Sequence, residues 1–312
     1  MTVWVLLSIN FFLPRAMPGD PIEAMLASAP STTASDRQQR EAAARYYGLD
    51  RPLPQQYFSY LGGLARGDLG FSIRYGRPVR DLLAERLPWT LLLALASVAM
   101  ATAVGVMSGI QAGWRRGGRV DAILVGIFTV LRGVPPFFLG SVAAFLFAVK
   151  LGWFPLAGGR VAFADDRGFA RVADIASHLV LPAATLGVLL AAGQFLTARA
   201  GMVSELGADY MLLGRAKGMD ERRLKYAYAA RNALLPVVTL IAIDLTVTAS
   251  AAVIFVEQIF AYPGIGRLIF DSVTFRDYPT LQGCFLALSL IVVTLNFLAD
   301  GLYGRLDPRT RT

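Results

Sequence analysis

The chain has 312 residues, of which 55% are hydrophobic and 17% are charged, and its formal net charge is +8. Soluble domains carry about 25% charged residues, so this composition argues against an ordinary soluble protein. A single cysteine (Cys284) and a single histidine (His178) exclude a disulfide framework and a zinc cluster, and we expect a small buried hydrophobe at Cys284 and an interfacial residue at His178.

Five long apolar runs predict membrane-spanning helices. A helix needs about 20 mostly apolar residues to cross the hydrocarbon, and backbone groups in lipid must hydrogen bond internally. A sixth, weaker run over 3–13 contains Asn10 and ends at Pro14; a secretory signal peptide is the alternative explanation for it. We therefore expect an all-α membrane protein with six transmembrane helices. The predicted spans are 3–13, 88–112, 122–149, 178–198, 235–257 and 281–302.

The first transmembrane helix, assigned to residues 1–17, leads into an extracytoplasmic segment over 18–87. Proline and glycine punctuate this segment, so we expect it to pack on the outer mouth of the membrane core rather than to form a catalytic domain. Helix-forming residues dominate 35–47, and a short approach helix is expected from Arg77–Arg80 to Pro88. Within the later spans, Pro135 and Pro136 should kink the third, and Pro182 lies near the outer end of the fourth.

Lysine and arginine set the expected orientation. With six spans and a cytoplasmic N-terminus, the inner segments 113–120, 199–231 and the C-terminal tail hold 13 cations, against six in the two short outer loops. Cytoplasmic loops carry this excess of Lys and Arg, so both termini are expected in the cytoplasm. The same rule explains the net positive charge without a nucleic-acid partner.

The basic segment from Asp209 to Pro236 lies between the fourth and fifth spans and predicts a helix–turn–helix at the membrane surface. Tyr210, Leu213 and Gly214 fall on one helical face at i, i+3, i+4 spacing. Gly218 can end the first helix in left-handed geometry, and Asp220 can cap the next. Two interpretations stay open on physical grounds: a surface offered to a protein partner, or a positively charged loop lying on anionic lipid.

Several motifs in order resemble the binding-protein-dependent ABC importer permeases, most closely the oligopeptide/dipeptide/nickel type. The central resemblance is Arg215-Ala-Lys-Gly218 followed by Arg231-Asn-Ala-Leu-Leu-Pro236, which looks like the cytoplasmic loop motif of that family. One departure is Leu212-Leu213-Gly214, where the motif carries Glu-Ala-Ala. Agreeing blocks along the chain are Pro18–Pro21, Tyr47–Asp50, Gly67–Gly70, Leu151–Trp153, Asp209-Tyr210, Pro263–Gly266, Arg276–Pro279 and Asp307–Arg309.

The resemblance implies a type I permease core over 88–303, with a coupling loop at 201–236 and a cytoplasmic tail at 304–312. It implies a prokaryotic inner-membrane importer in which a second permease subunit, two ATP-binding subunits, an extracytoplasmic substrate-binding protein and membrane lipid are the partners. Substrates of this type are peptides, nickel chelates, opines and glutathione-like solutes. A helix is implied to couple the chain to the ATPase through Asp209, Tyr210, Leu213, Gly214, Arg215, Ala216, Lys217 and Gly218.

No phosphate-binding loop of the form G-x-x-x-x-G-K-[ST] occurs in the sequence. ATP and magnesium are therefore expected to act in the partner ATPase subunits, and this chain is expected to bind no cofactor or metal and to be no enzyme. A charge near the middle of a membrane costs roughly 2.5–3.5 kcal/mol on insertion scales and usually faces a cavity or a partner. Asp244 and Arg132 are accordingly the candidates for the translocation path.

Alternatives remain for each of these ionisable residues. Asp244 could form a structural pair with Arg132 or with a sister subunit, and Arg132 could extend toward the cytoplasmic face. Glu257, with Pro263, Gly264 and Gly266, is a candidate outer gate, unless Glu257 simply faces water. Two other functions are a secondary transporter or channel using Arg132, Asp244 and Glu257, and a membrane anchor without flux.

Overall fold

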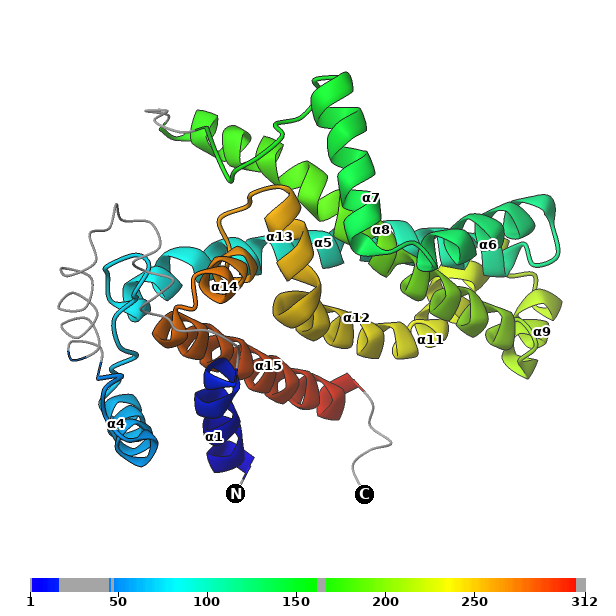
Figure 1. Cartoon of the computed structure of the whole chain (residues 1–312). Helices are drawn as coiled ribbons and strands as arrows, with labels where there is room; N and C mark the ends of the chain where they lie inside the picture. Colours follow the sequence, from blue (N-terminus) through cyan, green and yellow to red (C-terminus); the bar gives the residue numbers. More distant parts are fainter. Residues whose placement is uncertain (1, 17–44, 46–47, 162–166, 307–312) are drawn as a thin grey trace. The chain divides into compact units, whose positions relative to one another are not determined.

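The computed structural model describes residues 2–16, 45, 48–161 and 167–306, and helices are the dominant structure in this part of the chain (Figure 1). The pairing of Phe71 with Pro78 is an isolated β-bridge. The described helices are α1 (Thr2–Arg15), α4 (Leu53–Ala65), α5 (Val79–Trp114), α6 (Arg119–Arg132), α7 (Pro136–Ala143), η1 (Ala144–Lys150), α8 (Phe169–Glu205), α9 (Asp209–Ala216), α10 (Glu221–Arg223), η2 (Leu224–Ala229), α11 (Ala230–Ala233), α12 (Leu235–Val247), η3 (Thr248–Ala252), α13 (Val253–Ile259), α14 (Ile265–Thr274) and α15 (Tyr278–Leu306).

The all-helical prediction is confirmed. The expected approach helix and second span form one continuous helix, α5, and α8 begins before the predicted fourth span. Pro88 and Pro182 lie inside α5 and α8, which begin at Val79 and Phe169. Within the described residues, α5, α8 and α15 are each long and apolar enough to cross a membrane, and two bent helix pairs bring the number to five. Helix α1 is a shorter apolar helix, so the count of six spans stays a prediction. The helix expected over 35–47 lies almost wholly outside the described residues.

The third predicted span is two helices rather than one. The segments 119–132 and 136–150 meet at an angle of 103°. Gly133 caps the C-terminus of α6, and Pro135 and Pro136 open α7, where the missing proline N–H is no loss because the first turn leaves its N–H groups unpaired anyway. The predicted kink is thus confirmed, and it is a sharp reversal of direction.

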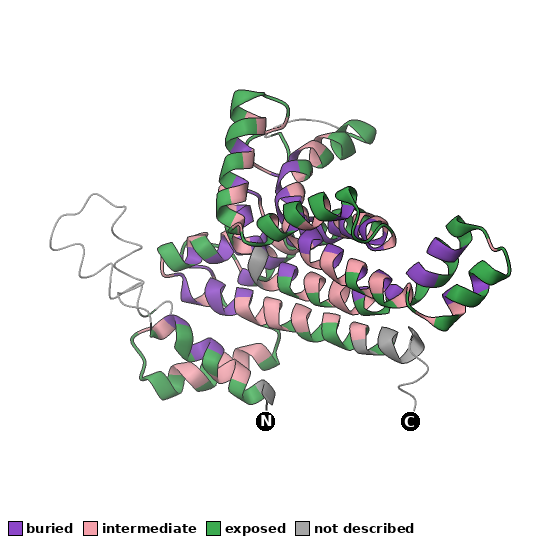
Figure 2. Cartoon of the chain, turned by 90° about the vertical axis from the view of Figure 1, so that its right-hand side faces the viewer, coloured by how far each residue is buried: buried purple, intermediate pink, exposed green. Residues whose placement is uncertain are grey.

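The contacts divide the chain into two compact units, each formed from segments distant in sequence. Unit 1 comprises residues 1–89 and 263–290, and unit 2 comprises residues 90–262 and 291–312. Helix α8 is the central element of unit 2, because α6, α7, α11, α12 and α13 all pack against it. Figure 2 shows buried positions gathered where helices meet and exposed positions on their outer faces.

A row of small residues lets α5 approach α8 closely within unit 2. Gly105, Gly109 and Gly113 recur every four residues, so they lie along one face of α5. A Cβ added at Gly105 would lie 2.6 Å from the backbone oxygen of Ala191, and one at Gly109 would lie 2.7 Å from that of Phe195. This is the small-residue packing by which helices associate in lipid, where no hydrophobic effect drives them together.

A buried carboxylate organises unit 1. Asp277 is 0% exposed and accepts a 2.5 Å hydrogen bond from the Ser72 hydroxyl and 3.2 Å bonds from the backbone N–H groups of Ile73 and Arg74. It also accepts bonds from the backbone and hydroxyl of Thr280 in the first turn of α15. One side chain therefore both caps α15 and fixes the loop that precedes α5.

Helix α1 is held in unit 1 by polar and aromatic contacts. The amide of Asn10 donates to the Gln282 carbonyl oxygen at 2.9 Å and to the Tyr60 hydroxyl at 3.1 Å. Phe11 is fully buried, and the Arg15 guanidinium lies 3.7 Å from the centre of its ring. Asn10, which weakened the first span in the sequence, is thus a contact between helices.

Candidate functional site

The segment from Asp209 to Pro236 contains the helix–turn–helix that its sequence predicts. Helix α9 ends at Ala216, and Gly218 follows with a φ of +71°, a left-handed conformation that glycine adopts without a Cβ clash. The carboxylate of Asp220 accepts hydrogen bonds from the backbone N–H groups of Arg222 and Arg223 at 3.1 and 3.3 Å. Both predicted caps are therefore confirmed, and the turn has a defined geometry.

Helix α9 is anchored by the face that carries Met211 and Gly214. Met211 and Gly214 are buried, whereas Leu213 is 55% exposed and the adjacent Leu212 is 72% exposed. A Cβ at Gly214 would lie 2.5 Å from Cδ2 of Leu224, so the absence of a side chain there allows η2 to pack closely against α9. The i, i+3, i+4 spacing of Tyr210, Leu213 and Gly214 did not say which side of the helix is buried, and the buried side includes Gly214 and Met211 but not Leu213.

Tyr210 joins α9 to its neighbours through its hydroxyl group. The hydroxyl forms a short hydrogen bond with the Glu205 carboxylate at the end of α8 and accepts one from the Asn232 amide at 3.3 Å. Burial, together with the bond to Glu205, raises the pKa of Tyr210 above its usual range, so the phenol stays protonated and donates to the carboxylate. The sequence places Tyr210 on the helix but gives no sign of this contact.

The cationic side of α9 is exposed. The Arg215 guanidinium forms an exposed ion pair with Glu221 at 3.3 Å and lies 5.9 Å from the ring centre of Trp114. Ala216, Lys217 and Gly218 are exposed as well. Helix α9 therefore combines a buried anchor with an outer surface of two leucines, an arginine and a lysine.

The two candidates for the translocation path are not partners of one another in the described contacts. The Gln194 amide of α8 donates to the Asp244 carboxylate of α12 at 2.8 Å, and Asp244 remains partly exposed. Arg132 is the exposed last residue of α6, immediately before the 103° bend. Gln194 is the contact that sequence reasoning missed, since a glutamine within an apolar helix gives no indication of its partner.

Glu257 is buried in unit 2 rather than facing water. It is 0% exposed, and its carboxylate accepts a 2.7 Å hydrogen bond from the Thr90 hydroxyl near the start of the apolar part of α5. The other gate candidates belong to unit 1, where Gly264 is the N-cap residue of α14, Pro263 precedes it and Gly266 is buried in the first turn. The outer gate that Glu257 is expected to form with these residues stays a prediction.

His178 and Cys284 are both buried side chains. His178 is 6% exposed and its Nδ1 lies 2.9 Å from the Asp174 carbonyl oxygen and 3.2 Å from the Asp174 carboxylate, one helical turn away. The interfacial position expected for His178 stays a prediction, and local contacts with Asp174 satisfy its buried ring. Cys284 is fully buried, as predicted.

Sequence reasoning also missed an ion pair at the start of α6. Asp121 is 3% exposed, and the Arg199 guanidinium of α8 donates to its carboxylate at 2.5 and 2.8 Å. The backbone N–H of Gly117 adds a third bond at 2.9 Å. Such two-pronged pairs are geometrically specific, so this contact fixes the basic turn between α5 and α6 against α8, close to α9 in sequence. The two residues are 78 positions apart, so no local sequence pattern indicates that they pair.

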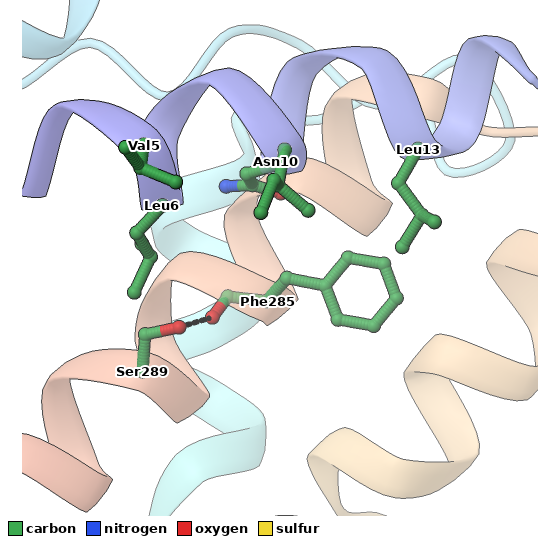
Figure 3. A pocket seen from close by; sticks show the side chains of 7 residues that line it. Val5, Leu6, Asn10, Leu13, Phe285 and Ser289 are labelled. Atoms are coloured by element: carbon green, nitrogen blue, oxygen red, sulfur yellow. Dashed lines mark hydrogen bonds between the residues drawn. The ribbon is translucent and has the colours of Figure 1, made fainter. Parts of the chain in front are cut away.

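An apolar groove lies between α1 and the first turns of α15 in unit 1 (Figure 3). Its volume is about 590 Å³. The two polar lining residues hydrogen bond to backbone carbonyls within the unit, Asn10 to Gln282 and Ser289 to Phe285. Figure 3 shows Val5, Leu6, Leu13 and Phe285 around the opening. The groove suits hydrocarbon rather than a charged solute, so it adds no candidate for a solute path.

Comparison with known proteins gives consistent results over nearly the whole chain. This chain is 36% identical over 313 residues to an oligopeptide transport system permease protein of Bacillus subtilis, and the alignment covers 99% of this chain and 96% of that protein. A di/tripeptide transport system permease protein of Pseudomonas aeruginosa is 34% identical (97% and 93% covered), and a glutathione transport system permease protein of Escherichia coli is 34% identical (99% and 95% covered).

The fold also has a solved counterpart. A chain of the inward-facing methionine ABC transporter MetNI superposes with a TM-score of 0.58 at 16% identity, over 72% of this chain and 96% of that one. The fold is therefore that of a type I ABC importer permease, and a secondary transporter or channel using Arg132, Asp244 and Glu257 is not favoured. The family described as binding-protein-dependent transport system inner membrane component matches residues 101–312, and this chain belongs to it, as a permease subunit of an ABC importer.

Proposed function

We propose that this permease works with a second permease subunit, two ATP-binding subunits and an extracytoplasmic binding protein to import peptides or a related small solute. The related solutes are nickel chelates, opines and glutathione-like compounds. The names of its relatives, which cite oligopeptides, di/tripeptides and glutathione, support this range. ATP and magnesium act in the partner ATPases, and this chain binds no cofactor and is no enzyme.

The proposed orientation follows from the distribution of positive charge. Both termini and the coupling loop at 201–236 are cytoplasmic, and the segment 18–87 is extracytoplasmic, in the inner membrane of a prokaryote. The excess of Lys and Arg in 113–120, 199–231 and the tail supports this assignment. The core at 88–303 then alternates between inward-open and outward-open states, driven by ATP at one end and loaded binding protein at the other.

The observation that supports the coupling role is that α9 is buried on one side and exposed on the other. Its Met211 and Gly214 side is packed against the membrane core, so a displacement of α9 must move η2 and α8 with it. Its Leu212 and Leu213 side is open to a partner. A helix that only rested on lipid headgroups would need no rigid attachment to α8.

We predict that Leu212→Asp or Leu213→Asp weakens binding of the ATPase subunits by roughly tenfold to a hundredfold. Burying one leucine is worth about 1.5–3 kcal/mol, each 1.4 kcal/mol is a factor of ten in affinity, and a desolvated carboxylate adds a further penalty. The measurement is the affinity of purified ATPase subunits for the permease pair in nanodiscs.

The matched control is Val120→Asp, which places the same charge on an apolar residue that is 41% exposed in the first turn of α6. Its ATPase affinity should stay within twofold of the wild type. Unchanged affinity in both leucine variants would remove α9 from the ATPase interface.

For the translocation path, we propose that the partly exposed Asp244 carboxylate, held by Gln194, contacts the passing solute. Asp244→Asn should slow uptake by roughly tenfold without preventing assembly, because a hydrogen bond to a charged group is worth about 1.5–3 kcal/mol. Uptake into proteoliposomes and co-purification of all subunits are the measurements. Thr246→Val is the control, since the Thr246 hydroxyl already bonds to the Ala242 carbonyl oxygen; equal uptake in Asp244→Asn and wild type would leave Asp244 a structural role only.

Arg132 is proposed as a second path residue and Glu257, with Pro263, Gly264 and Gly266, as part of the outer gate. The exposed position of Arg132 beside the α6–α7 bend supports its role. For Glu257 the support is its burial against Thr90, because a buried carboxylate that holds two helices together can release them when its contact is broken.

A further inference from the structure

A polar cavity of about 470 Å³ lies beside α9 in unit 2, between the end of α5 and the helices that follow the turn. Gln111, Trp114 and Arg115 line it from the α5 side, and Glu221, Arg222, Lys225 and Tyr226 line it from α10 and η2. Trp114 also packs against the buried cluster that contains Met211, but the polar and charged lining residues are not members of that cluster. The cavity therefore requires its own explanation.

Its innermost cation is Lys225, which is only 7% exposed. The ammonium group donates a short hydrogen bond to the Gln111 side-chain oxygen and lies 4.8 Å from the centre of the Tyr226 ring. Among the described residues no carboxylate lies within ion-pair distance of it. Lysine is almost never buried this far without a partner of opposite charge, and its ammonium has three donors, so two donors remain for a ligand.

The rest of the lining also favours an anion. Arg115 and Arg222 are exposed cations at the mouth, and the lone lining carboxylate, Glu221, is already paired with Arg215. Three cations thus face the cavity against one carboxylate that is neutralised from outside it. A negatively charged group would be attracted, whereas a zwitterionic group would bring its own positive charge into the same field.

The level of the cavity along α5 indicates which molecule supplies the negatively charged group. Residues 87–114 contain no charged side chain, and Trp114 is the last residue of α5. The cavity therefore begins where the hydrocarbon-crossing part of α5 ends, which is the level of lipid phosphates, and Trp and Tyr are enriched there. We propose that this cavity binds the phosphate headgroup of an anionic phospholipid in the leaflet that Trp114 reaches, with its acyl chains along α5.

The position links the lipid to the coupling helix. Arg215 of α9 contacts both Glu221 and the ring of Trp114, two residues of the cavity lining. A bound headgroup would hold α5, η2 and the base of α9 together. The lipid site itself is independent of the proposed coupling role, because binding is measured without ATP turnover.

The test is native mass spectrometry of the assembled transporter, titrated with phosphatidylglycerol or with phosphatidylcholine. One Lys or Arg near the membrane surface contributes enough to change anionic-lipid affinity about fivefold. The wild type should prefer phosphatidylglycerol for its tightest site by at least that factor, and Lys225→Gln should remove most of the preference. Arg115→Gln, at the exposed mouth, should reduce it without the risk of altering a buried side chain, and Lys225→Arg should largely retain it.

Arg231→Gln is the matched control, because it removes one exposed charge from the same loop and does not line the cavity. Equal lipid preference in wild type, Lys225→Gln and Arg115→Gln would overturn the proposal. So would loss of the ATPase subunits from Lys225→Gln with unchanged lipid binding, since an acidic side chain of the ATPase would then be the ligand. Displacement of the lipid by millimolar inorganic phosphate would instead assign the site to free phosphate.

Discussion

Replacing Gly109 with leucine is expected to abolish accumulation of the folded permease. A Cβ at this position would lie 2.7 Å from the Phe195 carbonyl oxygen, 2.8 Å from Cβ of Ala198 and 3.2 Å from the backbone nitrogen of Arg199. These neighbours are backbone or short side-chain atoms, so α5 and α8 must separate. Overfilling a packed core costs about 1–3 kcal/mol of folding free energy and occasionally more. The cost should be high here, because α8, the central helix of unit 2, would lose its packing against α5.

Fluorescence-detected size exclusion of the variant in mild detergent measures this loss. Gly126→Leu is the matched control, since Gly126 is also in a helix interior, in α6, and has nothing within 4 Å of its added Cβ. The control should give a monodisperse peak close to wild type. A normal peak from Gly109→Leu would mean that the α5–α8 contact tolerates a wider spacing.

Replacing Asp277 with alanine should release the loop before α5 from unit 1. The change leaves the Ser72 hydroxyl and the N–H groups of Ile73 and Arg74 without their acceptor. Removing one partner from a buried, charged network costs about 3–5 kcal/mol. At 1.4 kcal/mol for each factor of ten, hydrogen exchange of a peptide spanning 71–76 should accelerate roughly a hundredfold or more.

The control for this prediction is Asp271→Ala in the same unit, which loses one 3.0 Å bond from the Tyr75 hydroxyl. Exchange in the same peptide should then rise by less than tenfold. Asp277→Asn should lie between the two, because the amide keeps the shape but turns a donor toward groups that are themselves donors. Equal exchange in Asp277→Ala and wild type would contradict the organising role of this carboxylate.

The end of α9, the start of α10 and the break in the third span could be read from the sequence because local chemistry determines them. Gly218 adopts a backbone conformation that few other residues tolerate, and Asp220 caps through its own neighbouring amides. Two consecutive prolines, Pro135 and Pro136, follow Gly133 at the break, whereas the single Pro88 and Pro182 do not interrupt α5 and α8. In each case the cause lies within a few residues of the effect.

The anchored face of α9 was harder to predict, since Tyr210, Met211, Leu212 and Leu213 are four adjacent residues of similar apolar character. Which of them is buried depends on where Leu224 lies, and no local pattern gives its position. The four-residue spacing of Gly105, Gly109 and Gly113 was a readable signal for close helix packing, although it does not name α8 as the partner.

Contacts between distant residues could not be predicted at all. Three such contacts pair polar side chains whose own sequence surroundings give no sign of a partner. They are Asp121 with Arg199, Gln194 with Asp244, and Ser72 with Asp277. Their roles arise when the fold brings them together. Asp277 lies in a motif that supported the family resemblance, yet three of its five hydrogen bonds come from a loop about 200 positions earlier.

The Asn10–Gln282 contact joins residues 272 positions apart, and this has a consequence for biogenesis. A ribosome adds roughly 5–20 residues each second, so α1 waits on the order of 10–50 s for its partner carbonyl to be synthesised. Until then the Asn10 amide has only one of its two final acceptors, the Tyr60 hydroxyl, within the part of unit 1 already made. The contacts of unit 1 can therefore form only after residues 263–290 have been made, and nascent chains stalled before α15 should carry a first helix that is not docked on α15.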